Sequence, residues 1–218
     1  MNRLVIFDCD GTLVDSAATI VRAMESAFID AGLAAPDPLA TRRVVGLSLV
    51  EAMRAVLPKA ETELHHDLAE RYKRAFHDLR GAGSVEEPLY PGMAELIDRL
   101  DADGWLLGVA TGKSDRGLAY CLDSHGIKHR FVTLQTADRH PSKPHPAMLE
   151  AAIAEAGATP ATTVMIGDTS YDMMLAANAG ARAIGVNWGY HDAEDLMAAG
   201  AERVLENAAE LLDHLERA

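Results

Sequence analysis

Two carboxylates stand two residues apart where the first apolar run of the chain ends. The stretch LVIFDCDGTLVDS, residues 4–16, places Asp8 and Asp10 directly after the run. In an extended chain, side chains at positions 8 and 10 point to one side and Cys9 points to the other. Two acids in one place repel each other unless a cation is present, and carboxylate oxygens suit Mg²⁺. The spacing therefore predicts that both carboxylates serve one site in which Cys9 takes no part.

Polar residues follow three further apolar runs in a similar way. Thr111 and Gly112 follow WLLGVA, Lys143 stands in the loop after FVTL, and Asp168 follows TVMIG, with Asp172 four residues later. In an open parallel sheet, ligands bind beyond the carboxyl ends of the strands. We therefore expect these residues to meet Asp8 and Asp10 at one edge of a sheet, with Asp168 as a third oxygen donor to a metal.

The elements that must position these residues alternate between short apolar runs and amphipathic segments. The runs RLVIF, WLLGVA, FVTL, TVMIG, RAIGV and ERVL are typical of parallel strands that are covered on both faces. Helix start and stop signals frame residues 91–104, 114–126 and 144–157 between them. The pattern predicts an α/β fold with a doubly wound, mostly parallel, Rossmann-like sheet.

Residues 16–87 depart from this alternation because they contain no convincing strand. Two segments instead repeat apolar residues at helical spacing, one through Ile20, Met24 and Phe28 and one through Leu68 and Tyr72. We expect an α-helical cap domain, residues 16–87, inserted into a catalytic core domain formed by residues 1–15 and 88–218. The expected hinges are LVDS and EEPLYPG.

Composition narrows the classes of partner. The formal net charge of −13 disfavours nucleic acid and anionic membrane surfaces. No run approaches the roughly 20 apolar residues of a membrane helix, and the first apolar run is too short for a signal peptide. We expect a cytoplasmic protein, a monomer or homodimer, whose partner is a small metabolite.

Four motifs occur in a fixed order along the chain: DCDGTLVDS, VATGKS, HPSKPHP and GDTSYDM. In this order they resemble the motifs of the haloacid dehalogenase-like hydrolases, which are mostly phosphatases. A helical insertion directly after the first motif is similar to the small cap of the phosphoglycolate-phosphatase-like and β-phosphoglucomutase-like branch. The resemblance implies a Mg²⁺-dependent phosphatase that hydrolyses phosphoglycolate, a sugar phosphate or another small phosphorylated metabolite.

The resemblance also implies a role for each residue. Asp8 would attack phosphorus and form an aspartyl phosphate, and Asp10 would act as the acid and then as the base. Thr111 and the backbone at Gly112 would hold phosphoryl oxygens, and Lys143 would offset negative charge. The implied metal ligands are Asp8, the main-chain carbonyl of Asp10 and Asp168, with Asp172 in support.

Other activities on the same site stay open. Haloacid dehalogenases lack an acid at the position of Asp10, which disfavours that activity. A pyrophosphatase, a phosphomutase of the β-phosphoglucomutase type and a phosphonatase remain alternatives, and the last needs a cap lysine, Lys59 or Lys73. The stretch from Leu47 to Leu49 lacks the arginine usual in the mutases. A phosphate-ligand binder without activity would have no use for the acid Asp10.

Two features near the expected site have competing explanations. Arg42 and Arg43 precede a probable turn at Gly46, where they could hold a substrate carboxylate or second phosphate, or simply be solvated. Lys113 belongs to GKS, but position 107 is not the glycine that a phosphate-binding loop requires. We expect Lys113 to be solvated at the start of a helix.

Overall fold

A parallel β-sheet forms the centre of the computed structural model, which describes residues 2–216. Its strand order is β3-β2-β1-β4-β5-β6, and every pairing is parallel. The α/β class expected from the sequence is confirmed, and each expected run forms a strand. The strands are β1 (Leu4–Phe7), β2 (Leu106–Thr111), β3 (Phe131–Thr136), β4 (Thr163–Gly167), β5 (Arg182–Val186) and β6 (Arg203–Leu205).

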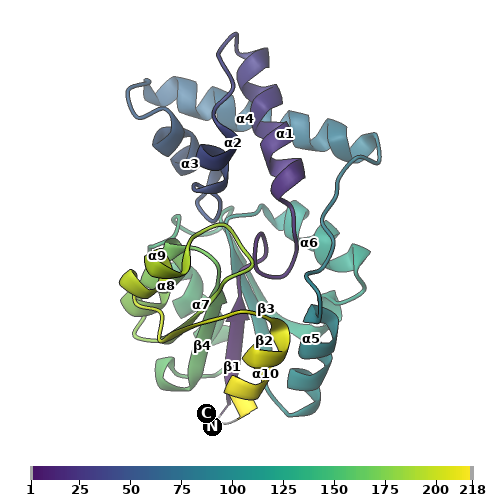
Figure 1. Ribbon diagram of the computed structural model, residues 1–218, viewed down its shortest axis with the longest axis vertical. Helices are drawn as coiled ribbons and strands as arrows, with labels where there is room; N and C mark the ends of the chain where they lie inside the picture. The colour runs from purple at the N-terminus through teal and green to yellow at the C-terminus, as the bar shows by residue number, and fades with distance from the viewer. Residues whose placement is uncertain (1, 217–218) are drawn as a thin grey trace.

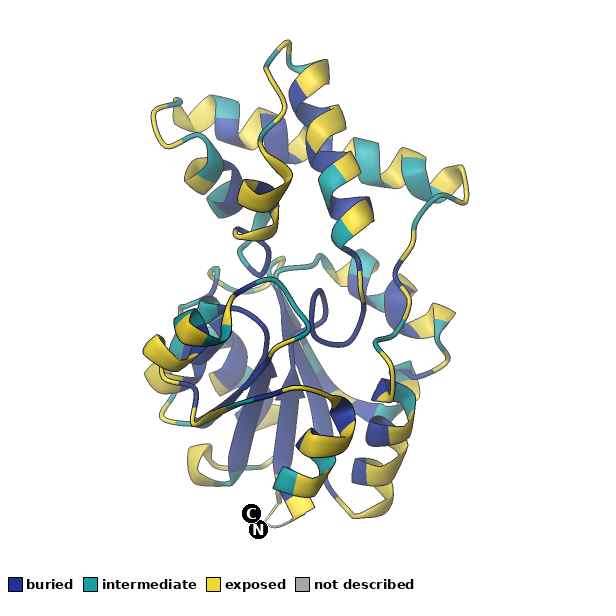
Figure 2. Cartoon of the chain, in the orientation of Figure 1, coloured by how far each residue is buried: buried dark blue, intermediate teal, exposed yellow. Residues whose placement is uncertain are grey.

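Helices cover both faces of this sheet, so the strands are buried (Figure 2). Alternate residues of β1 illustrate the division, since Val5 and Phe7 pack into one apolar cluster and Leu4 and Ile6 into the other. The first cluster includes α5 (Met93–Ala102), α6 (Asp115–Ser124) and α10 (Ala208–Glu216), and the second includes α7 (Ala147–Glu155), α8 (Ser170–Asn178) and α9 (Ala193–Ala198). Short 3₁₀ turns, η1 (Lys128–Arg130) and η2 (Pro160–Thr162), precede β3 and β4.

Four helices lie between β1 and α5 in the chain and stand above the carboxyl ends of the strands (Figure 1). They are α1 (Ala17–Asp30), α2 (Pro38–Arg42), α3 (Leu49–Val56) and α4 (Thr62–Gly81). The inner faces of α1, α3 and α4 form a third apolar cluster around Met24, Phe28 and Leu68. We call residues 16–87 the cap, and the boundaries of this domain stay a prediction from the sequence. Within residues 2–216, no helix has both the length and the apolar composition needed to cross a bilayer.

The two linkers between cap and core run side by side. The amide of Asp15 donates to the carbonyl of Pro88, with a nitrogen-to-oxygen distance of 2.8 Å. The amide of Tyr90 donates to the carbonyl of Leu13 at 3.0 Å, and Val14 forms an antiparallel bridge with Leu89. The chain therefore enters and leaves the cap at one place, next to the end of β1.

Candidate active site

Asp8 lies at the point where the order of the strands reverses. It directly follows β1, between β2 and β4, and its amide donates to the carbonyl of Ile166 at 2.9 Å. Its side chain is 1% exposed, and the Nζ atom of Lys143 lies 3.1 Å from its Oδ1 atom. The Oδ2 atom of Asp8 is buried and has no hydrogen-bond partner. A buried carboxylate oxygen of this kind is available to a ligand or a metal ion.

Asp168 and Asp172 complete a buried group of acids around Asp8. One oxygen atom from each of the three carboxylates can lie within 4.8 Å of the others. Asp168 accepts hydrogen bonds from the Thr12 hydroxyl at 2.7 Å and from the Tyr190 amide at 3.0 Å. These bonds fix the carboxylate and leave it further lone pairs for a cation.

Asp172 accepts more hydrogen bonds from the protein than Asp168 does. Its Oδ1 atom accepts from Lys143 at 2.6 Å, and its Oδ2 atom accepts from the amide and hydroxyl of Thr169 at 3.1 and 2.7 Å. Thr169 is the N-cap of α8, so this network forms where that helix begins. Asp172 therefore holds the ammonium of Lys143 next to the acidic group, and its supporting role toward a metal stays a prediction.

The charges of this group are not balanced by the protein. Burial raises the pKa of Asp8 to about 7, although Lys143 acts in the opposite direction and Asp172 adds to the rise. Burial and the neighbouring carboxylates also raise the pKa of Asp168 well above its usual value. For Lys143, burial disfavours the charge, but Asp172 and Asp8 raise its pKa above the ordinary range. One ammonium thus faces three buried acids, and the free oxygen of Asp8 and the all-oxygen donor set fit a divalent cation.

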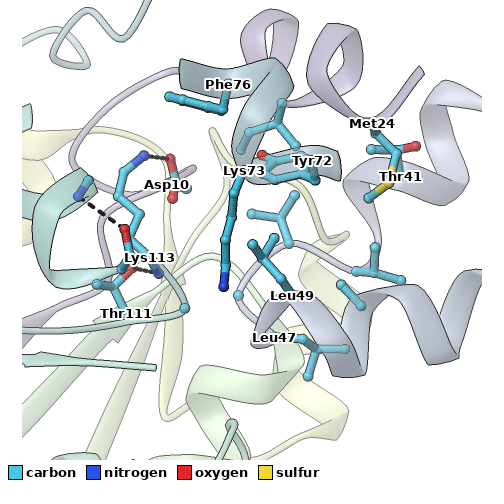
Figure 3. Close-up of a pocket in the computed structure, with 18 of the residues that line it drawn as sticks. Asp10, Met24, Thr41, Leu47, Leu49, Tyr72, Lys73, Phe76, Thr111 and Lys113 are labelled. Carbon is cyan, nitrogen blue, oxygen red and sulfur yellow. Dashed lines mark hydrogen bonds and ion pairs between the residues drawn. The ribbon is translucent and has the colours of Figure 1, made fainter. Parts of the chain in front are cut away.

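Asp10 is held by two partners outside this group. The Ser16 hydroxyl donates to its Oδ1 atom, and the Nζ atom of Lys113 lies 2.8 Å from the same oxygen (Figure 3). The same ammonium lies 2.6 Å from the Oε1 atom of Glu87. Ser16 and Glu87 lie in the two segments expected as hinges, LVDS and EEPLYPG, so both hinge segments contact the carboxylate of Asp10, one directly and one through Lys113.

The expectation that Lys113 is solvated is wrong. Its side chain is only 9% exposed, and Asp10 and Glu87 are 10% and 5% exposed. Burial opposes the charge of Lys113, but the two carboxylates raise its pKa well above the usual value. The physical reason is that Lys113 follows β2 at the same sheet edge as Asp10, which draws its side chain inward.

Thr111 is the last residue of β2, Gly112 follows it, and both line the same cavity as Asp8 and Asp10. The Thr111 hydroxyl oxygen accepts from the amide of Lys113 at 3.3 Å, and the residue is buried. A Cβ atom on Gly112 would lie 2.5 Å from the carbonyl oxygen of Leu47 and 2.8 Å from that of Gly46. The cap loop at Gly46 and Leu47 therefore rests on the Gly112 backbone, and only glycine allows this contact.

The loop after β5, with Trp188, Gly189 and Tyr190, packs beside the acids. The Trp188 indole donates to the carbonyl of Thr12 at 3.1 Å, and the hydroxyls of Tyr190 and Ser16 are 3.2 Å apart. A Cβ atom on Gly189 would lie 2.1 Å from that of Asp168. The loop thus closes the side of the site that faces β5.

A cavity of about 300 Å³ lies between cap and core above these residues (Figure 3). Asp8, Asp10, Thr111 and Gly112 form its core side. Gly46 lines it from the cap, together with residues of α1, α3 and α4. The volume is at the lower end of that of small-molecule pockets.

Arg42 and Arg43 do not line this cavity, so the structure does not bring them to the site. Arg43 instead forms exposed ion pairs with Asp192 at 3.0 Å and Asp195 at 3.1 Å. Its carbonyl also accepts from the Tyr171 hydroxyl at 3.3 Å. Arg43 therefore joins the cap to the core on the outer surface, and of the three residues expected there only Gly46 faces the cavity.

The sequence does not predict four side chains that the structure places here. Ser16 and Glu87 lie in the two segments that the sequence predicts only as hinges. Arg80, near the end of α4, and Arg116, in the first turn of α6, line the cavity but belong to no recognisable motif. Phe76 and Arg80 are four residues apart and therefore lie on one face of α4. This spacing is the pattern from which Arg80 could have been placed beside the apolar face of the helix.

Comparison with known proteins gives a consistent picture. The family described as haloacid dehalogenase-like hydrolase matches residues 5–186. The chain is 35% identical to the probable phosphatase IndB of Dickeya dadantii, with 97% of this chain and 93% of that protein covered. It is 30% identical to a phosphoglycolate phosphatase of Vibrio vulnificus, with 97% of this chain and 95% of that protein covered. A crystal structure of a predicted phosphatase from Clostridium acetobutylicum shares the fold, with a TM-score of 0.90, 24% identity and complete coverage of both chains.

Proposed function

Because the chain belongs to the haloacid dehalogenase-like hydrolases, we propose that it is a Mg²⁺-dependent phosphatase that acts through phosphorylated Asp8. One observation carries the proposal: Asp8, whose buried Oδ2 atom has no hydrogen-bond partner, lines a cavity that Asp10 also lines. The substrate is a small phosphorylated metabolite. Phosphoglycolate and sugar phosphates are the first compounds to test, since similar proteins are named phosphoglycolate phosphatases.

The reaction has two displacements at phosphorus. In the first, a carboxylate oxygen of Asp8 bonds to phosphorus, the ester bond to the leaving oxygen breaks, and Asp10 gives that oxygen its proton. In the second, water attacks phosphorus and gives a proton to Asp10, and the bond between Asp8 and phosphorus breaks. Inorganic phosphate leaves, and both carboxyl groups return to their starting forms.

Other groups of the site support these steps. Lys143 stabilises the ionised form of Asp8, and the hydroxyl of Thr111 and the amide of Gly112 are suited to hold phosphoryl oxygens. Ser16 and Lys113 orient Asp10. Mg²⁺ would be held by Asp8, the main-chain carbonyl of Asp10 and Asp168, and when bound it offsets the negative charge of the phosphoryl group.

The decisive experiment is the substitution Asp8→Asn. Phosphate release is measured with Mg²⁺ on 4-nitrophenyl phosphate and a panel of metabolites, and circular dichroism checks the fold. We expect no turnover from D8N and wild-type rates from D15N, which makes the same charge change on an exposed residue of the neighbouring loop. Beryllium fluoride, which imitates an aspartyl phosphate, should inhibit the wild type. Turnover by folded D8N at the wild-type rate would refute the proposal.

A further inference from the structure

Four lysine and arginine side chains line the cavity, in a protein whose net charge is −13. Two of them are already paired with acids. Lys73 lies 2.7 Å from Glu70, and Lys113 lies between Asp10 and Glu87. The other two, Arg80 and Arg116, have no acidic partner within ion-pair distance among residues 2–216. The cavity therefore holds two cations that the protein itself does not neutralise.

Arg80 is the more unusual of the two. Its guanidinium carbon lies 4.1 Å from the ring centre of Tyr120 and 5.3 Å from that of Phe76, so two aromatic rings fix its position. Its Nε and Nη2 atoms are covered and have no hydrogen-bond partner. Covering hydrogen-bond donors without supplying acceptors costs free energy, and an anion bound beside them would recover it.

Arg116 approaches the same place from the core. It lies in the first turn of α6, one turn before Tyr120, so both residues lie on one face of that helix. The ring that stacks on Arg80 is thus a neighbour of Arg116. A cation in the first turn is also opposed by the helix dipole, so local helix stability does not explain its presence. A bound anion would stabilise it.

The wall of the cavity that the cap provides is largely apolar. Leu47, Leu49, Tyr72 and Phe76 face the cavity (Figure 3). A leaving group of two carbons, as in phosphoglycolate, has little apolar surface to place against them. Burial of apolar surface against such a wall stabilises a complex, and more so the larger the area removed from water. The wall therefore favours a leaving group with an apolar part about the size of a ring.

Resting on the function proposed above, we infer that the substrate is a phosphomonoester whose leaving group carries an apolar segment and ends in a second anionic group. The reacting phosphate lies at Asp8, the apolar segment lies against the wall formed by Leu47, Leu49, Tyr72 and Phe76, and the anion lies between Arg80 and Arg116. Arginine forks bind carboxylates and phosphates alike, so the anion is one of these two.

Matched aryl esters test this inference. Values of kcat/KM are measured for phenyl phosphate, 4-carboxyphenyl phosphate, 1,4-phenylene bisphosphate and phosphoglycolate, on the wild type and on R116M. Hydrogen bonds to charged groups contribute about 1.5–3 kcal/mol, so we expect the wild type to prefer the anionic aryl esters over phenyl phosphate by roughly 10- to 150-fold. The larger of the two preferences identifies the anion. Phosphoglycolate should have a lower kcat/KM than the preferred aryl ester.

Variants assign the preference to the arginines. We expect R116M and, separately, R80Q to lower the ratio of kcat/KM between the anionic and neutral aryl esters towards one. The control R74M removes an exposed arginine of α4, the helix that carries Arg80. Arg74 does not line the cavity, so R74M should keep the wild-type ratio. An unchanged ratio in both R116M and R80Q would overturn the anion site, and a preference for phosphoglycolate would overturn the apolar segment. Failure of the wild type to hydrolyse any phosphomonoester would instead refute the proposed function.

Discussion

Removing the charge of Lys113 is expected to destabilise the protein strongly. In Lys113→Met, the carboxylates of Asp10 and Glu87 lose an ammonium that lies 2.8 and 2.6 Å away. Both carboxylates are at least nine-tenths buried, so water does not replace the lost partner. Breaking a buried ion pair costs about 3–5 kcal/mol, and Asp10 keeps the hydroxyl of Ser16. We therefore expect a loss near the lower end, about 3 kcal/mol.

The matched control is Lys128→Met. Lys128 lies 2.9 Å from Asp123, but the two side chains are 41% and 60% exposed. An exposed pair of this kind contributes about 1 kcal/mol or less. The free energies of unfolding are measured by urea denaturation of both variants and of the wild type. In a chain of this length, 3 kcal/mol corresponds to a fall in Tm of about 6–12 °C.

A further variant separates the ion pair from the packing of the lysine stem. Glu87→Gln in the K113M background removes one of the two unpaired charges, so we expect part of the lost stability to return. A loss in K113M no larger than that in K128M would refute the reasoning, because it would mean that Lys113 is effectively solvated. No recovery in the double variant would show that the lysine stem, and not its charge, provides the stability.

Three further predictions concern the metal, the loop at Gly112 and the cap surface. Because the pKa of Asp8 is raised to about 7, protons compete with Mg²⁺ below that pH, and the apparent affinity for Mg²⁺ should fall by about tenfold per pH unit between pH 7 and 5. Calorimetric titration with Mg²⁺ at three pH values checks this. An affinity for Mg²⁺ that does not depend on pH would contradict it. Gly112→Ala places a methyl group 2.5 Å from the carbonyl of Leu47, so kcat/KM should fall at least tenfold while Tm changes by a few degrees, whereas G81A, at a position with open space, should keep wild-type activity. Arg43→Ala breaks two exposed ion pairs and should cost about 1 kcal/mol or less in urea denaturation; a loss above 2 kcal/mol would show that these pairs are stronger than their exposure implies.

Much of the architecture could be predicted because short apolar runs and helix signals are local. The run before Asp8 and the run before Asp168 each formed a strand of the sheet, and parallel pairing then brought their ends together. The structure brings Asp8, Asp10, Thr111, Lys143 and Asp168 to that edge, as expected from the order of the motifs. Their chemical roles stay predictions until the variants are measured.

The contacts that cross between cap and core could not be predicted. Lys113 looked solvated because its partner Glu87 lies 26 residues away in a linker. Arg43, which follows α2, and Arg80, near the end of α4, are both arginines of the cap, but one pairs with the outer surface of the core and the other stacks at the cavity. Which of these occurs depends on the angle at which the cap meets the core, and no local pattern in the sequence encodes that angle.

The paired linkers have a consequence for how this architecture can change. Because the amide of Asp15 bonds to the carbonyl of Pro88, the two ends of the cap segment are adjacent, and the core need not stretch to accommodate what lies between them. The free-energy cost of closing a loop grows only slowly with its length, by about 0.6 kcal/mol for each doubling. Segments of different size and chemistry could therefore be exchanged at this junction while the acids at the sheet edge stay in place. Replacing a single continuous stretch of the gene could in this way change the class of substrate while the reaction stays the same.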